Sequence, residues 1–514
     1  MFVNKNLLFS FFAGAFGALA FAPVNFFPAS LISFSIFYLL LEKIERKKEV
    51  FWLGFVFGFG HFLAGIYWIS ISLLVDAKHF AWLIPFALTL IPSALALYVA
   101  LFALTYKFFI TKFRLSETYK KIILFALCWL LFEVLRSNLF SGFPWNLLGY
   151  IWLFNENFAQ LASVFGVYGL SLFAILISLF PTLFLQKKTP SCDKIFAAII
   201  VIFLCGNLVF AHFYIDDAKI ISDPKTKIRL VQANIKQDLK WDEQQKYNDF
   251  IRQIELTNSQ GLENVKVVVW SETSVPYVVN DNPILRSHLS NAAPKDGILI
   301  TGALRVEKEK AWNSIFVFNR SGIADHYDKH HLVPFGEFIP LQKFLSFLLL
   351  SEALDSLTGG GEGFSSGEGP HTLLGEGFSF SPLVCYEVIF SDEVVNRKHR
   401  PDIFINLTND AWFGNSSGPY QHFNMARMRA IEYGIPLIRV ANTGISALVD
   451  PFGRVVEKIG LNQSGVVDVD LIKNSETSIY ATYRYLPLIS LIAVMLIFLV
   501  FSVTGKKQKD EKLI

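Results

Sequence analysis

Three polar residues with complementary chemistry lie at or near the ends of strand-like runs in this 514-residue chain. Cys385 ends one run, Glu272 closely follows another, and Lys329 lies in the segment 327–331. A cysteine thiolate is a strong nucleophile, and the thioester that it forms reacts readily with amines. The thiol needs a base or a nearby positive charge, because its free pKa is about 8.5. The three residue types together predict covalent acyl chemistry.

Each of the three residues has a role to which its side chain is suited. A glutamate at the end of an apolar run can lose its water, which raises its pKa and makes Glu272 a candidate base. Lys329 could lower the pKa of the thiol and stabilise the oxyanion of a tetrahedral intermediate. Ordinary structural roles compete with these: Cys385 as a small buried side chain, Glu272 as a turn cap and Lys329 as a solvated loop cation. Their order at successive strand ends favours catalysis.

Eight apolar stretches frame these residues, and each reaches or approaches the ~20 residues that a membrane-spanning helix needs. The chain is 53% hydrophobic with a mean hydropathy of +0.42, which favours an integral membrane protein over a single soluble domain. A cleaved signal peptide is the alternative for the first stretch, although the second follows at once, as in a helical hairpin. The predicted spans are residues 7–22, 26–41, 50–75, 80–110, 122–134, 158–185, 195–214 and 486–503.

The distribution of basic residues predicts the topology. If Lys5 lies in the cytoplasm, the even-numbered connections are also cytoplasmic, and they are rich in Lys and Arg. The short outer connections contain or adjoin only Lys78 and Arg136. This pattern predicts that both termini are cytoplasmic and that the block 215–485 lies outside the cytoplasm. That block carries more acidic than basic residues, so the net charge of +3 comes from the membrane part and does not support nucleic-acid binding.

Three domains are predicted: 1–214 with seven spans, 215–485 as a soluble domain, and 486–514 with the eighth span and a cytoplasmic tail. Short β-rich runs alternate with helical patterns in the soluble block, which predicts an α/β layered domain. Cys385 is the only cysteine of this block, so we expect an unpaired, reactive thiol. The predicted strands are 228–233, 265–270, 297–302, 313–319, 377–385, 403–406, 437–441 and 446–449, with helices at 248–257, 285–291 and 420–433.

Other segments of the block have competing interpretations. The glycine-rich segment 359–369 lacks Gly-Lys-Ser/Thr and a following helix, so we expect a hairpin or lid rather than a phosphate loop. The apolar segment 338–350 is either a buried core helix or an arm that dips into the outer leaflet. His330 and His331 lack an accompanying metal-binding motif, and we predict no metal. Arg427 and Arg429 are expected to form salt bridges within the domain, with a phosphate as the alternative partner.

The Glu, Lys and Cys residues resemble the triad of the nitrilase superfamily, which lies on an αββα sandwich. Nearly the whole chain is similar to the apolipoprotein N-acyltransferases, a family of bacterial inner-membrane enzymes with a nitrilase-like domain between the seventh and eighth spans. The sequence departs from the family at Ser271, where proline is common before the glutamate. The motifs that carry the resemblance are FAP (21–23), GFPW (142–145), VQANI (231–235), KW (240–241), WSE (270–272), HLVPFGE (331–337), CYE (385–387), NDAWFG (409–414), MARMRA (425–430) and NTG (442–444).

The resemblance implies a ping-pong acyl transfer, the last step of lipoprotein maturation. Cys385 would take an acyl chain from a phospholipid, typically phosphatidylethanolamine, with Glu272 as base and Lys329 at the oxyanion. The thioester would then pass the chain to the α-amino group of the diacylglyceryl-cysteine of an apolipoprotein. The expected location is the inner membrane, with the catalytic domain in the periplasm and with no cofactor.

The resemblance also assigns further residues to the site. Glu337, Tyr386 and Glu387 would support the triad, whereas Trp241 and Trp412 would line the acyl or headgroup pocket. Ordinary aromatic packing is the alternative for both tryptophans. Two other functions compete with the transferase: a membrane-tethered nitrilase-type amidase, in which water resolves the thioester, and a lipid-binding or transport scaffold without enzymatic activity.

Overall fold

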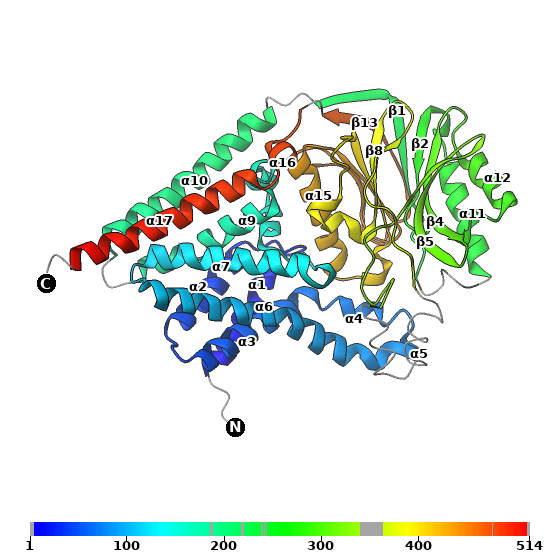
Figure 1. The fold of residues 1–514 in the computed structure, drawn as a ribbon. Coiled ribbons are helices and arrows are strands. Elements are labelled where there is room, and N and C mark those ends of the chain that lie inside the picture. The colour runs from blue at the N-terminus through cyan, green and yellow to red at the C-terminus, as the bar shows by residue number, and fades with distance from the viewer. Residues whose placement is uncertain are drawn as a thin grey trace.

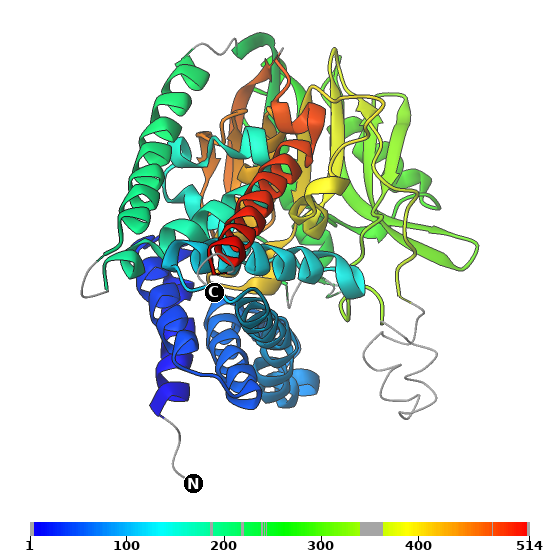
Figure 2. The ribbon, with the colours of Figure 1, turned by 60° about the vertical axis from the view of Figure 1, so that its left-hand side comes forward.

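A computed structural model of the chain shows a helical bundle joined to a domain of two β-sheets (Figure 1). The structure describes residues 5–185, 189–216, 220–237, 240, 242, 244–339, 363–474 and 476–510. Side chains are described up to residue 500. Figure 2 shows that α10 (Ser191–Asp216) rises along one side from the bundle to the level of the sheets.

Apolar helices occupy all eight of the predicted spans. Five helices in the described part of the chain are long and apolar enough to cross a membrane, and three others are apolar but only 10–17 residues long. The predicted stretch 122–134 was too short, because its helix runs on to form a 24-residue span. The five long helices are Lys47–Ile66 (α3), Ala77–Phe113 (α5, η2 and α6), Thr118–Ser141 (α7 and η3), Ala162–Phe184 (α9 and η5) and Ser191–Asp216 (α10); the shorter ones are Lys5–Ala20 (α1 and η1), Pro28–Glu42 (α2) and Leu486–Val500 of α17 (Leu486–Asp510).

Close packing of helix backbones holds the bundle together where glycines meet a neighbouring helix. A Cβ on Gly14 of α1 would lie 2.0 Å from the carbonyl oxygen of Phe57 in α3. A Cβ on Gly60 of α3 would lie 2.2 Å from the carbonyl oxygen of Phe11. Small residues of this kind let helices approach closely in a membrane, where dispersion contacts replace the hydrophobic effect between helices.

The soluble domain contains two sheets whose inner faces pack against each other. Along β2, Val267 and Val269 pack into the core between the sheets, whereas Val268 faces the helices outside, as the period of two predicts. The first sheet has the order β13-β1-β2-β4-β5-β6, with β3 paired to β4; the second has the order β12-β11-β10-β9-β8-β7. The strands are Ile220–Gln232 (β1), Val265–Val269 (β2), Val275–Val278 (β3), Ile298–Glu307 (β4), Lys310–Asn319 (β5), Gly322–Asp328 (β6), Leu373–Leu374 (β7), Ser379–Val384 (β8), Ile403–Thr408 (β9), Leu437–Ala441 (β10), Ser446–Val449 (β11), Val455–Ile459 (β12) and Gly465–Asn474 (β13).

Helices cover the outer face of each sheet, which completes an αββα sandwich. Helices α11 (Gln245–Thr257) and α12 (Pro283–Ala292) pack on the first sheet. Helix α15 (Gly418–Tyr433) packs on the second sheet, and its apolar residues belong to the same core cluster as the membrane helices. The two-sheet domain therefore shares one of its layers with the bundle, and Figure 1 shows α15 between the two parts.

The sequence predicted the central strands and missed those at the edges. Strands β3, β6, β7, β12 and β13 were not predicted, and β1 begins eight residues earlier than expected. The first four residues of β12 are exposed, and so are most of those of β6, so neither has the apolar run that marks a buried strand. The predicted arm at 338–350 lies outside the described residues from 340 onward, as does the part of the glycine-rich segment before residue 363.

Candidate active site

Strands of both sheets bring the three predicted catalytic residues together from different parts of the chain. Glu272 follows β2, Lys329 follows β6 of the same sheet, and Cys385 follows β8 of the facing sheet. All three are buried, with exposed fractions of 7%, 1% and 8%. The charges of Glu272 and Lys329 both act on the Cys385 thiol, so the three groups form one electrostatic unit.

The backbone at Cys385 adopts a conformation that few residue types favour. Its φ of +50° lies in the left-handed region, at the point where β8 ends and the 3-10 helix Cys385–Ile389 begins. A residue with a Cβ at such a φ stores about 1–2 kcal/mol of strain. Burial and the charge of Glu272 raise the pKa of the Cys385 thiol, while Lys329 opposes them. The resting thiol is therefore protonated and needs a base.

Glu272 has a buried carboxylate with the chemistry that a base for this thiol requires. Its Oε1 accepts a hydrogen bond of 2.8 Å from Asn313 Nδ2, whereas its buried Oε2 has no hydrogen-bond partner within the part of the chain that the structure describes. Burial raises the pKa of Glu272, and Lys329 partly offsets this effect. A desolvated carboxylate with one free oxygen is a stronger proton acceptor than an exposed one.

Lys329 is held as a cation by Glu337. Its Nζ lies 2.9 Å from Oε1 and 2.7 Å from Oε2 of Glu337. Glu337 is fixed in turn by the backbone N–H of Val333 at 2.9 Å. Burial opposes the charge on Lys329, but Glu337 and Glu272 raise its pKa above the ordinary value. The ammonium group thus stays charged and keeps a fixed position.

Glu387 holds the turn that carries the thiol against the loop that carries Lys329. Its carboxylate accepts hydrogen bonds from the backbone N–H of Val384 at 2.6 Å, from Tyr327 Oη at 2.8 Å and from the backbone N–H of His330 at 2.8 Å. Although burial opposes ionisation, the hydrogen bonds and charge of His330 lower the pKa of Glu387. Glu387 therefore fixes the position of the turn that carries the thiol.

Two residues next to the triad contact the end of the span Thr118–Ser141 and the residue that follows it. Tyr386 Oη donates a hydrogen bond of 3.3 Å to the carbonyl oxygen of Gly142. His331 Nε2 lies 3.0 Å from the carbonyl oxygen of Ser141, and its Nδ1 lies 2.7 Å from Glu393 Oε2. These contacts connect the bundle to the segments next to Lys329 and Cys385.

The structure also contains site residues that the sequence did not single out. Asn313 bridges Glu272 and Glu337, with Nδ2 at 2.8 and 3.2 Å from the two carboxylates. Lys240 is buried, its Nζ lies 3.4 Å from the carbonyl oxygen of Glu272, and burial lowers its pKa to about 8. Lys240 belongs to the KW motif, which was the one signal that could have identified it.

The remaining predicted residues have varied settings. Trp241 lies outside the described residues, and Trp412 is 42% exposed in the 3-10 helix Asp410–Phe413. Arg427 pairs with Glu156 at 3.6 Å, and the buried Arg429 pairs with Glu432 at 2.9 Å. Arg429 therefore forms the predicted salt bridge within the domain. The prediction was wrong for Arg427, whose partner belongs to the membrane part, because α15 packs against the bundle.

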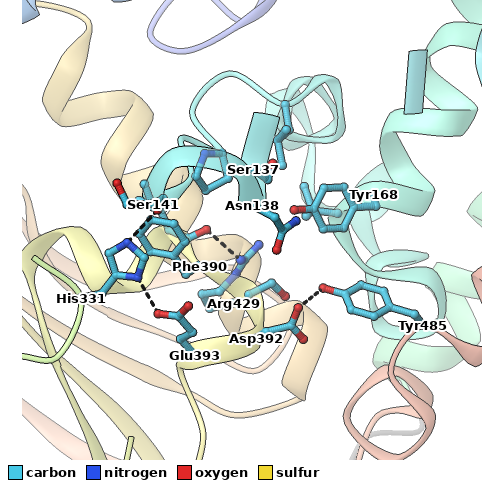
Figure 3. A pocket seen from close by; sticks show the side chains of 15 residues that line it. Ser137, Asn138, Ser141, Tyr168, His331, Phe390, Asp392, Glu393, Arg429 and Tyr485 are labelled. Atoms are coloured by element: carbon cyan, nitrogen blue, oxygen red, sulfur yellow. Dashed lines mark hydrogen bonds and ion pairs between the residues drawn. The ribbon is translucent and has the colours of Figure 1, made fainter. Parts of the chain in front are cut away.

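A cavity of about 190 Å³ lies between the bundle and the two-sheet domain, and none of the three candidate residues is among the described residues that line it. Figure 3 shows His331, Phe390 and Glu393 of the catalytic domain facing Ser137 and Tyr168 of the bundle across this space. The cavity therefore opens between the two parts, next to the segment that follows Cys385.

Comparison with known proteins gives matches to both parts of the chain. Residues 13–180 match the model of the apolipoprotein N-acyltransferase N-terminal domain, and residues 227–479 match that of the carbon-nitrogen hydrolases. An apolipoprotein N-acyltransferase of Allorhizobium ampelinum is 37% identical over 90% of this chain and 89% of its own. That of Rickettsia prowazekii is 36% identical over 97% and 99%.

A solved structure of a CN-hydrolase superfamily protein from Xanthomonas campestris aligns with 53% of this chain and 96% of its own, with 17% identity and a TM-score of 0.36.

Proposed function

This chain belongs to the apolipoprotein N-acyltransferase family and is a membrane acyltransferase that N-acylates lipoproteins, and we propose that Cys385 carries the acyl chain as a thioester. The observation that supports this assignment is the buried Oε2 of Glu272, which has no hydrogen-bond partner among the described residues and forms one electrostatic unit with a protonated thiol and the Lys329 cation.

In the first half-reaction, Glu272 takes the thiol proton and the sulfur of Cys385 attacks the ester carbonyl carbon of a phospholipid. Lys329 stabilises the oxyanion that forms on the carbonyl oxygen. When the intermediate collapses, the carbon–oxygen bond breaks, and the alkoxide of the lysophospholipid takes the proton from Glu272. The acyl group remains on the sulfur.

In the second half-reaction, the α-amino group of the diacylglyceryl-cysteine attacks the thioester carbon. Glu272 accepts a proton from the amine, the carbon–sulfur bond breaks, and the thiolate of Cys385 takes that proton back. The products are the N-acylated lipoprotein and the free enzyme, so no cofactor is required. Glu337 and Glu387 position the cation and the nucleophile, and Tyr386 shapes the wall beside the thiol.

We also propose a lipid donor and a membrane topology for this enzyme. The donor is phosphatidylethanolamine, and Trp412 and Trp241 line the path of its acyl chain or headgroup. The domains are 1–214, 215–485 and 486–514, with the catalytic domain in the periplasm and both termini in the cytoplasm. The excess of Lys and Arg in the even-numbered connections supports this orientation. Reporters fused after Tyr214 and after Gly505 test it.

A thioester-trapping experiment tests the chemistry. Purified protein in phosphatidylethanolamine vesicles with a labelled acyl chain should acquire label that hydroxylamine releases. A diacylglyceryl lipopeptide should then take up that label on its amine. Cys385→Ala should abolish labelling, whereas Cys192→Ala, at an exposed cysteine of α10, should leave it unchanged. Release of free fatty acid would indicate a hydrolase, and absence of label would indicate a scaffold.

A further inference from the structure

A buried polar network lies behind Cys385 and has no part in the steps above. It consists of Asn406 on β9, Asp410 in the 3-10 helix that follows, His422 on α15 and Arg439 on β10. Each of these residues is at most 1% exposed. Burying four polar side chains is costly unless they bond to one another, so their arrangement calls for a functional explanation.

The network meets the nucleophile at its backbone carbonyl. The Cys385 oxygen lies 3.2 Å from His422 Nε2 and 3.5 Å from Asn406 Nδ2. Asn406 Nδ2 also donates to the carbonyl oxygen of Leu383 at 3.1 Å, so it spans the residues on either side of the strand end. These contacts hold the peptide that follows the strained φ of Cys385.

Asp410 and Arg439 fix the orientation of the His422 ring. Asp410 Oδ1 lies 2.8 Å from His422 Nδ1, and Asp410 Oδ2 accepts a hydrogen bond of 2.7 Å from Arg439 Nη2. Arg439 Nη1 donates to Asn406 Oδ1 at 2.6 Å, which closes the network. Arg439 and His422 outweigh burial and lower the pKa of Asp410 to about 2, so the carboxylate stays ionised beside the ring.

The membrane part covers this network. The ring of Trp145, from the outer loop after α7 (Thr118–Asn138), lies 5.5 Å from the ring of His422. Trp145 Nε1 also donates a hydrogen bond of 2.7 Å to Gln421, the neighbour of His422 on α15. Phe413 packs against the same imidazole at 5.9 Å.

Burial and the charge of Arg439 lower the pKa of His422, so the neutral ring has a single N–H. With that proton on Nε2, the ring donates to the Cys385 carbonyl, and Nδ1 accepts from Arg439 Nη2 at 3.2 Å. The exclusion of water strengthens the bond to the carbonyl.

We infer that His422 is a positioning residue that holds the Cys385 peptide in its left-handed conformation, with Asp410 setting the orientation of the ring. The inference rests on the proposed role of Cys385 as nucleophile. Rotation about φ swings the Cβ and sulfur of Cys385 relative to Glu272 and Lys329. Because a misplacement of about 1 Å can cost about 100-fold in rate, the hydrogen bond to the carbonyl controls acylation without touching substrate.

Two substitutions at one position separate positioning from general stability. His422→Gln offers an amide N–H where Nε2 lies, whereas His422→Leu removes the donor. We expect His422→Leu to lower the single-turnover rate of thioester formation about 100-fold, and His422→Gln to stay within about tenfold of the wild type. The KM for phospholipid should be the same in both variants, since His422 is fully buried behind the nucleophile.

The rate at which iodoacetamide alkylates Cys385 gives a second readout that needs no lipid. The alkylation rate should rank the variants in the same order as the acylation rate. The alkylation rate of Asp410→Asn should fall between those of the two His422 variants. His399→Gln, at an exposed histidine of the same domain, is the matched control and should change nothing.

Three outcomes would contradict the inference. Equal acylation rates for His422→Gln and His422→Leu would show that the N–H donor at this position has no role in acylation. A change confined to KM or to the melting temperature would indicate a purely structural effect. Full transfer activity in Cys385→Ser would overturn the proposed nucleophile, and this inference with it, whereas a Cys385-dependent enzyme that is insensitive to His422 would overturn this inference alone.

Discussion

Substitution of Glu337 by glutamine isolates the ion pair that holds Lys329. Both carboxylate oxygens lie within 2.9 Å of the ammonium nitrogen, and the side chains of Lys329 and Glu337 are only 1% and 11% exposed. Two unit charges about 3 Å apart attract each other by about 6 kcal/mol at an effective dielectric constant of ~20. Glutamine keeps one acceptor oxygen but places an amide N–H against either the ammonium group or the backbone N–H of Val333.

The expected loss of stability is smaller than the gross attraction, because the pair also carries a desolvation cost. Breaking a buried pair by removing one charge costs about 3–5 kcal/mol, and we expect the lower end for Glu337→Gln, since one hydrogen bond survives. At about 2–4 °C per kcal/mol, the melting temperature of the catalytic domain should fall by roughly 6–12 °C. The acylation rate should fall by about 10²–10³-fold, as for loss of one oxyanion donor, with little change in KM.

The assay combines thermal unfolding, followed by circular dichroism in detergent, with transfer of a labelled acyl chain to Cys385 below the unfolding transition. Glu376→Gln, at an exposed glutamate of the same domain, is the control and should behave as the wild type. A Glu337→Gln enzyme that melts at the wild-type temperature and acylates at the wild-type rate would refute the argument that this pair holds the cation.

Three shorter predictions concern pH and packing. Burial raises the pKa of Glu272, so its carboxylate becomes protonated at a higher pH than a free glutamate does. The rate of thioester formation should therefore decrease at a higher pH as the solution is acidified, which a pH profile of the single-turnover rate measures. A rate that does not change in acid would exclude Glu272 as the base. Burial opposes the charge of His330, but Glu387 and a second carboxylate raise its pKa from 6.5 to about 9. Its contribution to stability is therefore complete below about pH 6.5 and lost as pH rises toward 9, so the melting temperature should fall over that range more in the wild type than in His330→Gln. A Cβ on Gly302 of β4 would lie 2.7 Å from the Glu272 Cα, so Gly302→Ala should cost about 1–3 kcal/mol and slow acylation, whereas Gly206→Ala, which meets nothing within 4 Å, should do neither.

The candidate triad was predictable because each member carries a local signal. Glu272 and Cys385 adjoin apolar runs that became the buried strands β2 and β8, and Lys329 lies in a segment at the end of β6. Strand β6 itself was missed, because four of its seven residues are exposed and its apolar pattern is weak. The membrane helices were predictable for the same reason as the buried strands: length and hydropathy are properties of a contiguous segment.

The partners of these residues were not predictable, since they arise from contacts between distant segments. The Asn313 amide reaches Glu272 from 41 residues away, and His422 reaches the Cys385 carbonyl from 37 residues away on a helix that also packs against the membrane bundle. No periodicity marks such pairs, and Asn and His have many ordinary roles.

The sequence by itself therefore determined the residue types of the site, the alternation of apolar helices and strands, and the family. Only the tertiary structure decided the left-handed backbone at Cys385, the ion pair of Glu337 with Lys329, and the burial of a Glu272 oxygen that no described residue contacts by a hydrogen bond. The physical reason is that reactivity depends on burial and on neighbours in space, and these exist only after the two sheets and the bundle have packed together.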